Sequence, residues 1–574
     1  MLFMGLGKTL YNSSVSLIEE RPGGDLDVEI ALSERLLRKK ASGAWPERAL
    51  RVLEPRWKSQ ELLLAENRDV ISPIDRETTM NEALPFFEYL HREKLDRFTR
   101  HYNSELEFVT HHLCHASAAT AMSPFDKAVI VVLDGAGSAY ENFSSGSAEI
   151  DGTLAHERLG GAKASDGAHE ECTVYLMDRG RLRPVAKRWR KFEPSAEVPK
   201  KWFSESLGIF YESAAEYVFD SNRAAGKLMG LAPFGRAREV GSRIEFLESL
   251  DWSLAFKGKG KRDWDESGRF QLYADLAASV QSDFERELWS LLEFVRESFP
   301  DYRNCILTGG CALNCTFNAK LSKRGLFDAV YVPPFPGDES IGFGAASYRF
   351  LTTRDMFKPM PVQRQHGFFG PRSSVPEEDQ IAKLFEGCEI QRPESITEEV
   401  AERLFRGEIV GWFQGRSESG PRSLGHRSIL ADPSRAGLKD ELNSKIKFRE
   451  DFRPYGCSCV HERAADYFDV DKGFDNPYMS FAVETRADWR EKLSQVTHVD
   501  GTSRMQTVRK SQNPMFHELI SKFGAKSGFA CVLNTSLNVM GEPIVETPAD
   551  ARAFLEKTPV HGLAIGPFFI TRAK

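Results

Sequence analysis

Residues 128–138 read AVIVVLDGAGS, and this stretch decides the fold class. Its apolar residues, most of them β-branched, predict a buried strand that ends at the carboxylate of Asp134. A similar apolar run, Cys305–Leu307, leads into a pair of glycines. Helix-like stretches at Ser279–Glu297 and Glu398–Arg406 alternate with runs of this kind. The alternation predicts an α/β protein with buried sheets.

Composition limits the classes of function. The chain has 574 residues, enough for two or more domains. Its 76 Lys and Arg residues face 83 Asp and Glu residues, and the net charge of −7 argues against a general nucleic-acid binder. Its apolar runs fall short of the roughly 18 residues that span a bilayer, and nine sparse cysteines predict no disulfide framework. We expect a cytoplasmic protein without a membrane partner; its oligomeric state, a homodimer included, stays open.

Proline and turn residues between 355 and 376 predict a boundary between two domains. We place an N-terminal domain at 1–358, a linker at 359–390 and a C-terminal domain at 391–574. The basic run Lys187–Lys191 is expected to be a solvated loop.

Three histidines in HHLCHASAA, residues 111–119, predict a metal site. On a helix, His111 and His115 share one face at the spacing of metal ligands, whereas His112 pairs with His115 in a different register. Asp134, at the end of a strand, can hold a metal as well. Imidazole with carboxylate suits iron, manganese or zinc, and spacing does not choose among them.

Glycine-rich turns in this part predict contacts with phosphate or nucleotide. Glycines in 134–138 and 309–314 let backbone N–H groups approach an anion, a purine or a ribose. Residues 224–235, AAGKLMGLAPFG, place a lysine among glycines. The candidate contacts are Gly135, Gly137, Lys227, Gly309, Gly310 and Asn314. Asp338 is expected to be exposed in a turn rich in proline and glycine.

Two basic segments in the C-terminal half predict an anion pocket. Residues 415–430 and 443–456 mix Arg and Lys with Ser, Gly and Asn. Lys445, Lys447 and Arg449 alternate, so on a strand they would point to one face. Convergent Arg and Lys side chains suit a small oxyanion.

GKLMGLAPFG, GGCALN and FPGDESIGFGAA occur in an order that resembles the carbamoyltransferases of the nodulation and antibiotic O-carbamoyltransferase family. The resemblance implies an actin/Hsp70-like (ASKHA) ATPase-type fold for the N-terminal half and a YrdC-like α/β domain after it. It implies a divalent metal, Fe2+ in close relatives with Mn2+, Zn2+ or Mg2+ left open, at His111, His115, Asp134 and Asp338. Lys39 and Lys40 are further candidates for nucleotide or carbamoyl contact.

The resemblance also implies an ATP- and metal-dependent O-carbamoyltransferase. Carbamoyl phosphate and ATP would give carbamoyl-adenylate in the C-terminal domain. The N-terminal domain would pass the carbamoyl group to a hydroxyl of a small molecule, a natural product or a sugar. The residues that match the family's carbamoyl phosphate site are Arg416, Arg422, Lys447, Arg449, Arg504, Asn534 and Ser536.

This chain departs from the family at Tyr11 and Asn12, where relatives have His-Asp in the first hairpin. A phenol with a pKa of about 10 is a poor base at neutral pH. His112 or Asp134 taking the proton is the favoured interpretation; a more acidic or more nucleophilic acceptor, or a lost second step, are the others. Two alternative functions stay open, a fused tRNA threonylcarbamoyl-type enzyme and a non-catalytic nucleotide-binding protein derived from the family.

Overall fold

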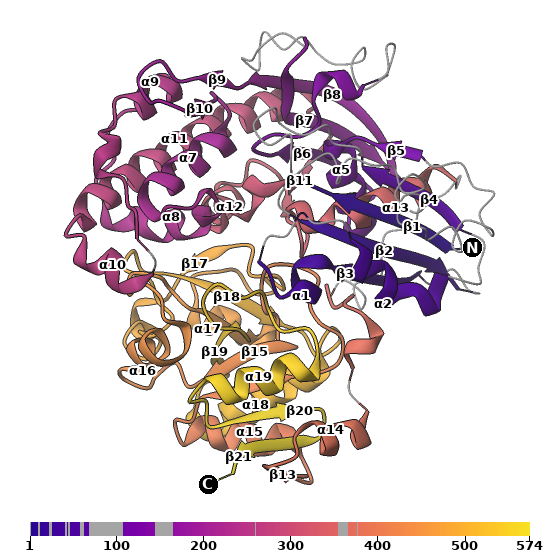
Figure 1. Cartoon of the computed structure of the whole chain (residues 1–574), viewed down its shortest axis with the longest axis vertical. Helices are drawn as coiled ribbons and strands as arrows, with labels where there is room; N and C mark the ends of the chain where they lie inside the picture. Colours follow the sequence, from indigo (N-terminus) through magenta and orange to yellow (C-terminus); the bar gives the residue numbers. More distant parts are fainter. Residues whose placement is uncertain are drawn as a thin grey trace.

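A computed structural model describes residues 2–9, 12–21, 26–40, 43, 46–57, 62–67, 107–143, 165–258, 260–353, 366–375 and 377–573. Figure 1 shows two parts. The N-terminal part, up to residue 353, is coloured indigo to rose, and the C-terminal part, from residue 366, is coloured orange to yellow below it. The mixture of helices and sheets confirms the predicted α/β class.

Two five-stranded sheets form the frame of the N-terminal part. Their strands are β1 (Leu2–Lys8), β2 (Ser13–Glu20), β3 (Leu26–Leu32), β4 (Leu62–Asn67) and β5 (Glu107–Val109), then β6 (Lys127–Leu133), β7 (Ala168–Asp178), β8 (Arg181–Lys191), β11 (Asn304–Thr308) and β12 (Ala329–Tyr331). The first sheet has the order β3-β2-β1-β4-β5, with β1 antiparallel to β2 and parallel to β4. The second has the order β12-β11-β6-β7-β8, with β6 parallel to β11 and antiparallel to β7. Short strands β9 (Glu193–Pro194) and β10 (Trp202–Phe203) pair separately.

Helices pack on and beside these sheets (Figure 1). They are α1 (Ser33–Leu37), α2 (Glu47–Trp57), α5 (His111–Met122), α7 (Leu207–Phe219), α8 (Ala225–Leu231), α9 (Arg243–Glu248), α10 (Lys261–Glu266), α11 (Phe270–Ser298), α12 (Cys315–Arg324) and α13 (Ile341–Thr352). None of the helices in the described ranges combines the length and the apolar character needed to cross a bilayer.

One mixed sheet of nine strands organises the C-terminal part. Its strands are β13 (Cys388–Gln391), β14 (Val410–Phe413), β15 (Arg427–Ala431), β16 (Gly456–Val460), β17 (Ala482–Glu484), β18 (Thr502–Val508), β19 (Cys531–Ser536), β20 (Gly562–Ile565) and β21 (Phe568–Arg572). Their order is β13-β21-β20-β14-β15-β19-β16-β18-β17. The helices are α14 (Glu378–Leu384), α15 (Ile396–Phe405), α16 (Leu438–Glu441), α17 (Ala464–Tyr467), α18 (Pro514–Ser527) and α19 (Pro548–Lys557), with a π-helical turn at Leu442–Lys447.

Three local expectations differ from the structure. Residues 378–390, expected to be linker, contribute to α14 and β13, and β13 pairs with β21 of the C-terminal sheet. Lys445 and Lys447 do not alternate on a strand, because α16 continues into the π-helical turn, which leaves Lys445 exposed and buries Lys447. The run Lys187–Lys191 is no loop either: it ends β8, where the carboxylates of β7 lie opposite it and allow its charges to be buried.

Close backbone contacts hold α13 between the first sheet and α5. A Cβ atom on Gly5 of β1 would lie 1.9 Å from the carbonyl oxygen of Gly342. A Cβ atom on Gly344 would lie 2.0 Å from the carbonyl oxygen of Cys114 in α5. Only glycine permits these approaches, and they fix the helices that carry the candidate site.

We expect Gly344→Ala to lower the free energy of unfolding by about 3 kcal/mol or more. Alanine favours the helix by about 1 kcal/mol over glycine, but its methyl group meets main-chain atoms of Cys114, and these cannot move unless α5 and α13 separate. Urea denaturation measures the change. Gly241→Ala is the control, since a Cβ atom there meets nothing within 4 Å. Equal midpoints for the two variants would contradict this packing.

Candidate metal centre and cationic cleft

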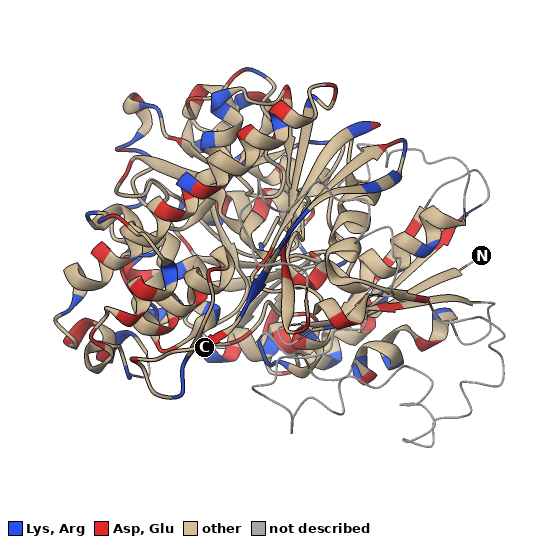
Figure 2. Cartoon of the chain, turned by 90° about the horizontal axis from the view of Figure 1, so that it is seen from above, with Lys and Arg blue, Asp and Glu red and all other residues tan. Residues whose placement is uncertain are grey.

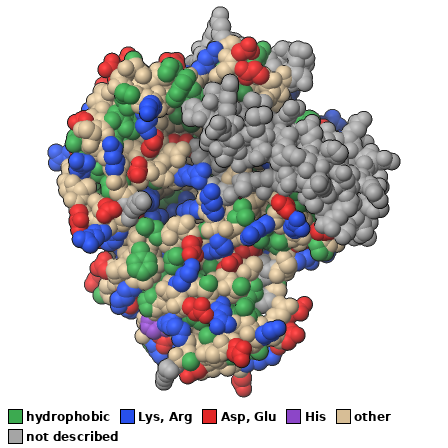
Figure 3. Space-filling model, viewed as in Figure 1, with side chains coloured by type: hydrophobic (Ala, Val, Ile, Leu, Met, Phe, Trp, Pro, Cys, Tyr) green, Lys and Arg blue, Asp and Glu red, His purple; other side chains and the backbone are tan. Residues whose placement is uncertain are grey.

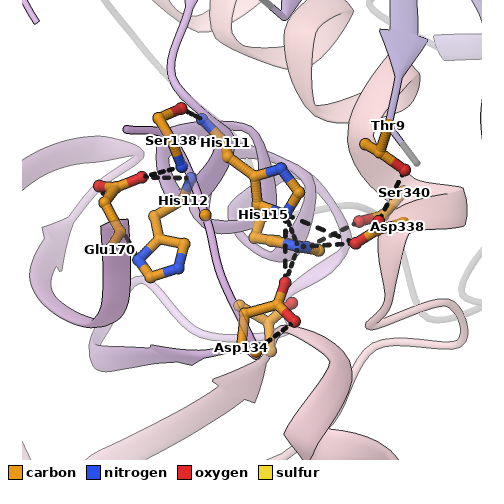
Figure 4. Close-up of polar contacts among 12 residues, drawn as sticks. Thr9, His111, His112, His115, Asp134, Ser138, Glu170, Asp338 and Ser340 are labelled. Carbon is orange, nitrogen blue, oxygen red and sulfur yellow. Dashed lines mark hydrogen bonds and ion pairs between the residues drawn. The ribbon is translucent and has the colours of Figure 1, made fainter. Parts of the chain in front are cut away.

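Four side chains from α5, the end of β6 and the turn before α13 face one another (Figure 4). The Nε2 atoms of His111 and His115 lie 3.2 Å apart. Oδ2 of Asp134 lies 3.1 Å and 3.2 Å from these two nitrogens. Oδ1 of Asp338 lies 3.4 Å and 3.8 Å from them. The structure thus brings together all four residues expected to bind a metal, with Asp338 largely buried rather than exposed.

These distances fit a single divalent cation. With metal–ligand bonds of about 2.1 Å, neighbouring donor atoms lie about 3.0–3.4 Å apart. The set offers two imidazole nitrogens and two carboxylate oxygens, all four within 4.8 Å of one another. Iron, manganese and zinc accept such donors, and the geometry does not choose among them.

Neighbouring polar groups orient the four side chains. Oδ1 of Asp134 accepts from the backbone N–H of Gly135 at 2.7 Å, and Oδ2 of Asp338 accepts from the hydroxyl of Thr9 at 2.7 Å. Nδ1 of His115 lies 3.1 Å from the Ser340 hydroxyl. Burial opposes ionisation of Asp134, but hydrogen bonds from the two histidines hold its pKa well below its usual range. Outer partners of this kind fix the ligand orientation in metal sites.

His112 lies outside this group. Its Nδ1 is 2.8 Å from the Thr173 hydroxyl, and in Figure 4 its ring points away from Asp134. The ring is fully buried, burial lowers the pKa of His112, and its Nε2 has no hydrogen-bond partner among the described residues. The helix register therefore selects His111 and His115, and His112 packs on the β7 side of α5.

A buried ion pair behind His112 was missed from the sequence. Lys187 donates to Glu170 at 2.5 Å, and both side chains are almost completely buried. The second oxygen of Glu170 accepts from the backbone N–H of Ser138 at 3.1 Å. The Ser138 hydroxyl in turn accepts from the backbone N–H of His111 at 2.9 Å. This chain of contacts connects β7 and β8 to the first residue of the metal-ligand helix.

The glycine turns support the centre rather than offering free N–H groups. The N–H of Gly137 donates to the carbonyl oxygen of Glu170, and that of Gly309 donates to the carbonyl oxygen of Pro336. The N–H of Gly135 is taken by Asp134, as described above. Gly310 lies beside Asp134, since a Cβ atom there would be 3.0 Å from its Oδ1. The N–H groups of Gly135, Gly137 and Gly309 thus already have acceptors within the protein.

Asn314 is also engaged within the protein. Its Oδ1 caps α12 by accepting from the backbone N–H of Phe317 at 3.1 Å, and its Nδ2 donates to Gln281 at 2.9 Å. Helix capping accounts for this side chain without a nucleotide.

Lys and Arg side chains gather around the hollow between the two parts (Figure 3). Four of them were expected at the carbamoyl phosphate site, Lys40 and Lys227 were expected at a nucleotide, and Arg453 was not expected. The seven residues, which we call the cationic cleft, are Lys40, Lys227, Arg422, Lys447, Arg449, Arg453 and Arg504. In the described part of the chain, they form ion pairs with a single carboxylate, that of Glu450. Elsewhere Lys and Arg are interspersed with Asp and Glu (Figure 2).

The charges of the cleft repel one another. Burial, then the neighbouring Arg504, lowers the pKa of Arg422 to about 9. Burial, then Arg453, lowers the pKa of Arg449 to about 10. Lys447 donates only to neutral oxygens, those of Ser536 and Asn538, the latter at 2.8 Å through the amide oxygen. Lys447 and Arg449 are buried and have no carboxylate partner among the described residues, which favours an anionic ligand.

Two expected contacts, Arg416 and Asn534, lie apart from the cleft. The guanidinium of Arg416 donates to the carbonyl oxygens of Val28, Phe369 and Gly370, so it ties the two parts together. Asn534 is buried and donates to the Ser458 hydroxyl at 2.9 Å.

Lys39 is exposed, and its backbone N–H donates to the carbonyl oxygen of Glu34. Tyr11 lies outside the described residues. The carbonyl oxygen of Asn12 accepts from the backbone N–H of Thr9, and Asn12 is half-buried.

The metal centre and the cleft meet at the turn that carries Asp338. A Cβ atom on Gly420 would lie 2.1 Å from the carbonyl oxygen of Pro334, so the loop that holds Arg422 rests on this turn. The carboxylate of Glu339, next to Asp338, favours the charged form of Arg422. Burial raises the pKa of Glu339 to about 7. The two sites are thus neighbours.

Fold and site define an α/β protein in which a cluster of metal-type ligands adjoins a cationic cleft. Family models described as "Carbamoyltransferase N-terminus" and "Carbamoyltransferase C-terminus" match residues 77–347 and 401–572. The chain belongs to the carbamoyltransferase family of enzymes, as the resemblance implied.

Curated relatives agree with this assignment. Nodulation protein NolNO of Sinorhizobium fredii is 33% identical over 490 residues, which cover 82% of this chain and 64% of that protein. Nodulation protein NolO of Bradyrhizobium diazoefficiens is 32% identical over 81% of this chain and 79% of its own length. The 3'-hydroxymethylcephem-O-carbamoyltransferase of Amycolatopsis lactamdurans is 32% identical over 61% of this chain and 65% of its own. The chain therefore spans less than two thirds of NolNO.

Solved structures give weaker likeness. The match with HypF of T. kodakarensis covers 61% of this chain and 47% of the HypF chain, at 15% identity and a TM-score of 0.29. A ROK hexokinase from Thermus thermophilus covers 62% of this chain with all of its own, at 13% identity and a TM-score of 0.27. Scores this low assign no fold.

We expect Asp134→Asn and His115→Gln to lose binding of one equivalent of Mn2+, Fe2+ or Zn2+, because each removes a donor atom from the four. Metal content after dialysis, and the rise in unfolding temperature that metal causes, measure the loss. His112→Gln is the matched control, and it should keep full stoichiometry since His112 faces β7. Undiminished metal binding by Asp134→Asn would show that the four side chains do not share an ion.

Proposed function

We propose that the protein is an ATP- and metal-dependent O-carbamoyltransferase that uses carbamoyl phosphate. The observation that carries this proposal is the cationic cleft, whose seven cations pair with a single carboxylate among the described residues. The cleft lies beside a four-ligand centre in a chain of this family. The acceptor is the hydroxyl of a small molecule, a natural product or a sugar. The cephem relative, named for O-carbamoyl transfer, supports this class of acceptor.

The domain division that we propose assigns one step to each part. Residues 1–358 would form an actin/Hsp70-like domain, which the two five-stranded sheets support, and residues 391–574 would form a YrdC-like domain on the nine-stranded sheet. The metal ligands all come from the former, and five of the seven cleft cations come from the latter.

The first step would make carbamoyl-adenylate in the cleft. Water cleaves carbamoyl phosphate to carbamate and phosphate; a carbamate oxygen then attacks the α-phosphorus of ATP and pyrophosphate leaves. Arg422 and Arg504 would bind phosphoryl oxygens with their forked N–H donors, and Lys447 would act as a point charge. Because the cations are held before the ligand arrives, they need little reorganisation as negative charge develops.

The second step would transfer the carbamoyl group. The acceptor oxygen attacks the carbamoyl carbon, the bond from that carbon to the AMP oxygen breaks, and the hydroxyl proton leaves. A divalent metal held by His111, His115, Asp134 and Asp338 would supply Lewis-acid stabilisation of negative charge. Contacts with the adenylate handle would position the carbonyl group.

The base for the acceptor remains the point where this chain differs from its family. His112 is buried on the β7 side of α5, and Oδ2 of Asp134 faces both ligand histidines. Neither position favours direct contact with an acceptor. The geometry therefore gives no support to the base role that the sequence favoured for His112 or Asp134.

We expect pyrophosphate release when the protein is incubated with carbamoyl phosphate and ATP. Arg422→Met and Arg504→Met should each lower that rate roughly 10- to 100-fold, the effect of losing one charge-assisted hydrogen bond. Lys445→Met is the control, since Lys445 is exposed and pairs with Glu441. A silent wild-type protein would favour the non-catalytic alternative, and label passed to tRNA from bicarbonate and threonine would favour the other one.

We expect Tyr11→Phe to retain carbamoyl-adenylate formation, whatever its effect on transfer, because the family's first hairpin serves the acceptor. Pyrophosphate release and acceptor carbamoylation, measured on the same preparation, separate the two steps. If pyrophosphate release disappears, Tyr11 belongs to the first step instead.

A further inference from the structure

One ion pair crosses between the two parts at the cationic cleft. Lys227 of α8 donates to Oε1 of Glu450 at 2.8 Å. Lys227 keeps about a quarter of its side chain exposed, whereas Glu450 is almost completely buried. Sequence reasoning placed Lys227 among the nucleotide contacts, but its ammonium group is bound to a carboxylate of the other part.

Glu450 also lies close to the guanidinium of Arg453, another cation of the cleft. Its Oε2 is 3.6 Å from Arg453, beyond hydrogen-bond distance, and has no hydrogen-bond partner among the described residues. Burial raises the pKa of Glu450, yet Lys227 and then Arg453 outweigh it, so the carboxylate stays ionised. An ionised carboxylate this close to Arg453 competes with any anionic substrate for the same N–H donors.

Packing fixes the helix that carries Lys227. Gly230 of α8 lies against Pro454, since a Cβ atom there would be 3.4 Å from its Cδ. Phe452 packs on Phe219, with ring centroids 6.0 Å apart. The ammonium group of Lys227 lies 5.1 Å from the centroid of the Phe219 ring. The ammonium group is therefore held at a set position relative to residues 450–454.

We infer that Lys227 is a positioning residue, which draws the Glu450 carboxylate toward itself, so that Glu450 meets Arg453 only as a long ion pair of 3.6 Å and leaves the N–H donors of that guanidinium to the anionic substrate. Without Lys227, the carboxylate would close on Arg453, the nearest remaining cation, and block it. The N-terminal part would thus set the anion affinity of a site built mostly by the C-terminal part. The inference rests on the proposed function, because it assumes that the cleft binds carbamoyl phosphate or the phosphates of ATP.

A neighbouring ion pair provides a matched control. Lys261 of α10 pairs with Asp451 at 2.8 Å, so it crosses between the same two parts at the next residue along the chain. Asp451 is largely exposed, and Lys261 is not part of the cleft. Exposed pairs contribute little, so Lys261→Met should leave anion binding unchanged.

The experiment is a double-mutant cycle on the full chain, with dissociation constants for carbamoyl phosphate and for inorganic pyrophosphate from titration calorimetry. Lys227→Met should weaken binding roughly 10-fold, and Lys227→Arg should restore it. Adding Glu450→Gln should cancel the loss, so the double variant should bind within about threefold of Glu450→Gln alone. KM for carbamoyl phosphate should follow the dissociation constants, with kcat little changed.

The outcomes separate the inference from the function beneath it. If Lys227→Met weakens binding by the same factor with and without Glu450→Gln, Lys227 contacts the anion directly and the inference is overturned. Unchanged binding in Lys227→Met overturns it as well. If the wild-type chain binds neither anion, the proposed function fails instead.

Discussion

The N-terminal part depends on one cluster, in which two imidazole nitrogens of His111 and His115 face two carboxylate oxygens of Asp134 and Asp338. The four atoms lie within 4.8 Å of one another. Partly buried carboxylates are costly unless cations or donors face them. Asp134 and Asp338 each turn one oxygen to the histidines and bind the other to Gly135 or Thr9. The close contacts of α13 with β1 and α5 bring these groups together, so packing at glycines and the chemistry of the centre cannot be separated.

Sequence reasoning could find three of these ligands because each lies next to a strong local signal. His111 and His115 are one turn apart on a helix, and Asp134 follows an apolar strand, whereas Asp338 was assigned through the resemblance to the family. The choice of His111 over His112 needed the helix register, which depends on what α5 packs against. The glycine turns were located correctly, but their N–H groups are used inside the protein, and only tertiary structure shows that Glu170 and Pro336 accept them.

Other groups could not be predicted because their partners are distant in sequence. Lys187 can be buried because it forms an ion pair with Glu170 on the neighbouring strand. The sequence feature that could have predicted this pair is a hairpin with acidic residues on one strand and basic residues on the other. Lys445, Lys447 and Arg449 imitate a strand, yet α16 extends into a π-helical turn. Lys40 and Lys227 were expected to contact nucleotide, but their place beside the cations of the C-terminal part depends on how the two parts pack together.

The cleft keeps its like charges together because other contacts hold their loops. The buried carboxylate of Glu418 accepts the backbone N–H groups of Leu424, His426 and Arg427 at 2.7, 2.9 and 3.1 Å. Arg35 of α1 donates to the carbonyl oxygens of Glu418 and Gly420. The loop that carries Arg422 is thus fixed from its own part and from the other. The contacts made on folding therefore offset the repulsion among the cations before any ligand binds. An anion that binds in the cleft then relieves this repulsion, and this relief favours binding of the substrate there.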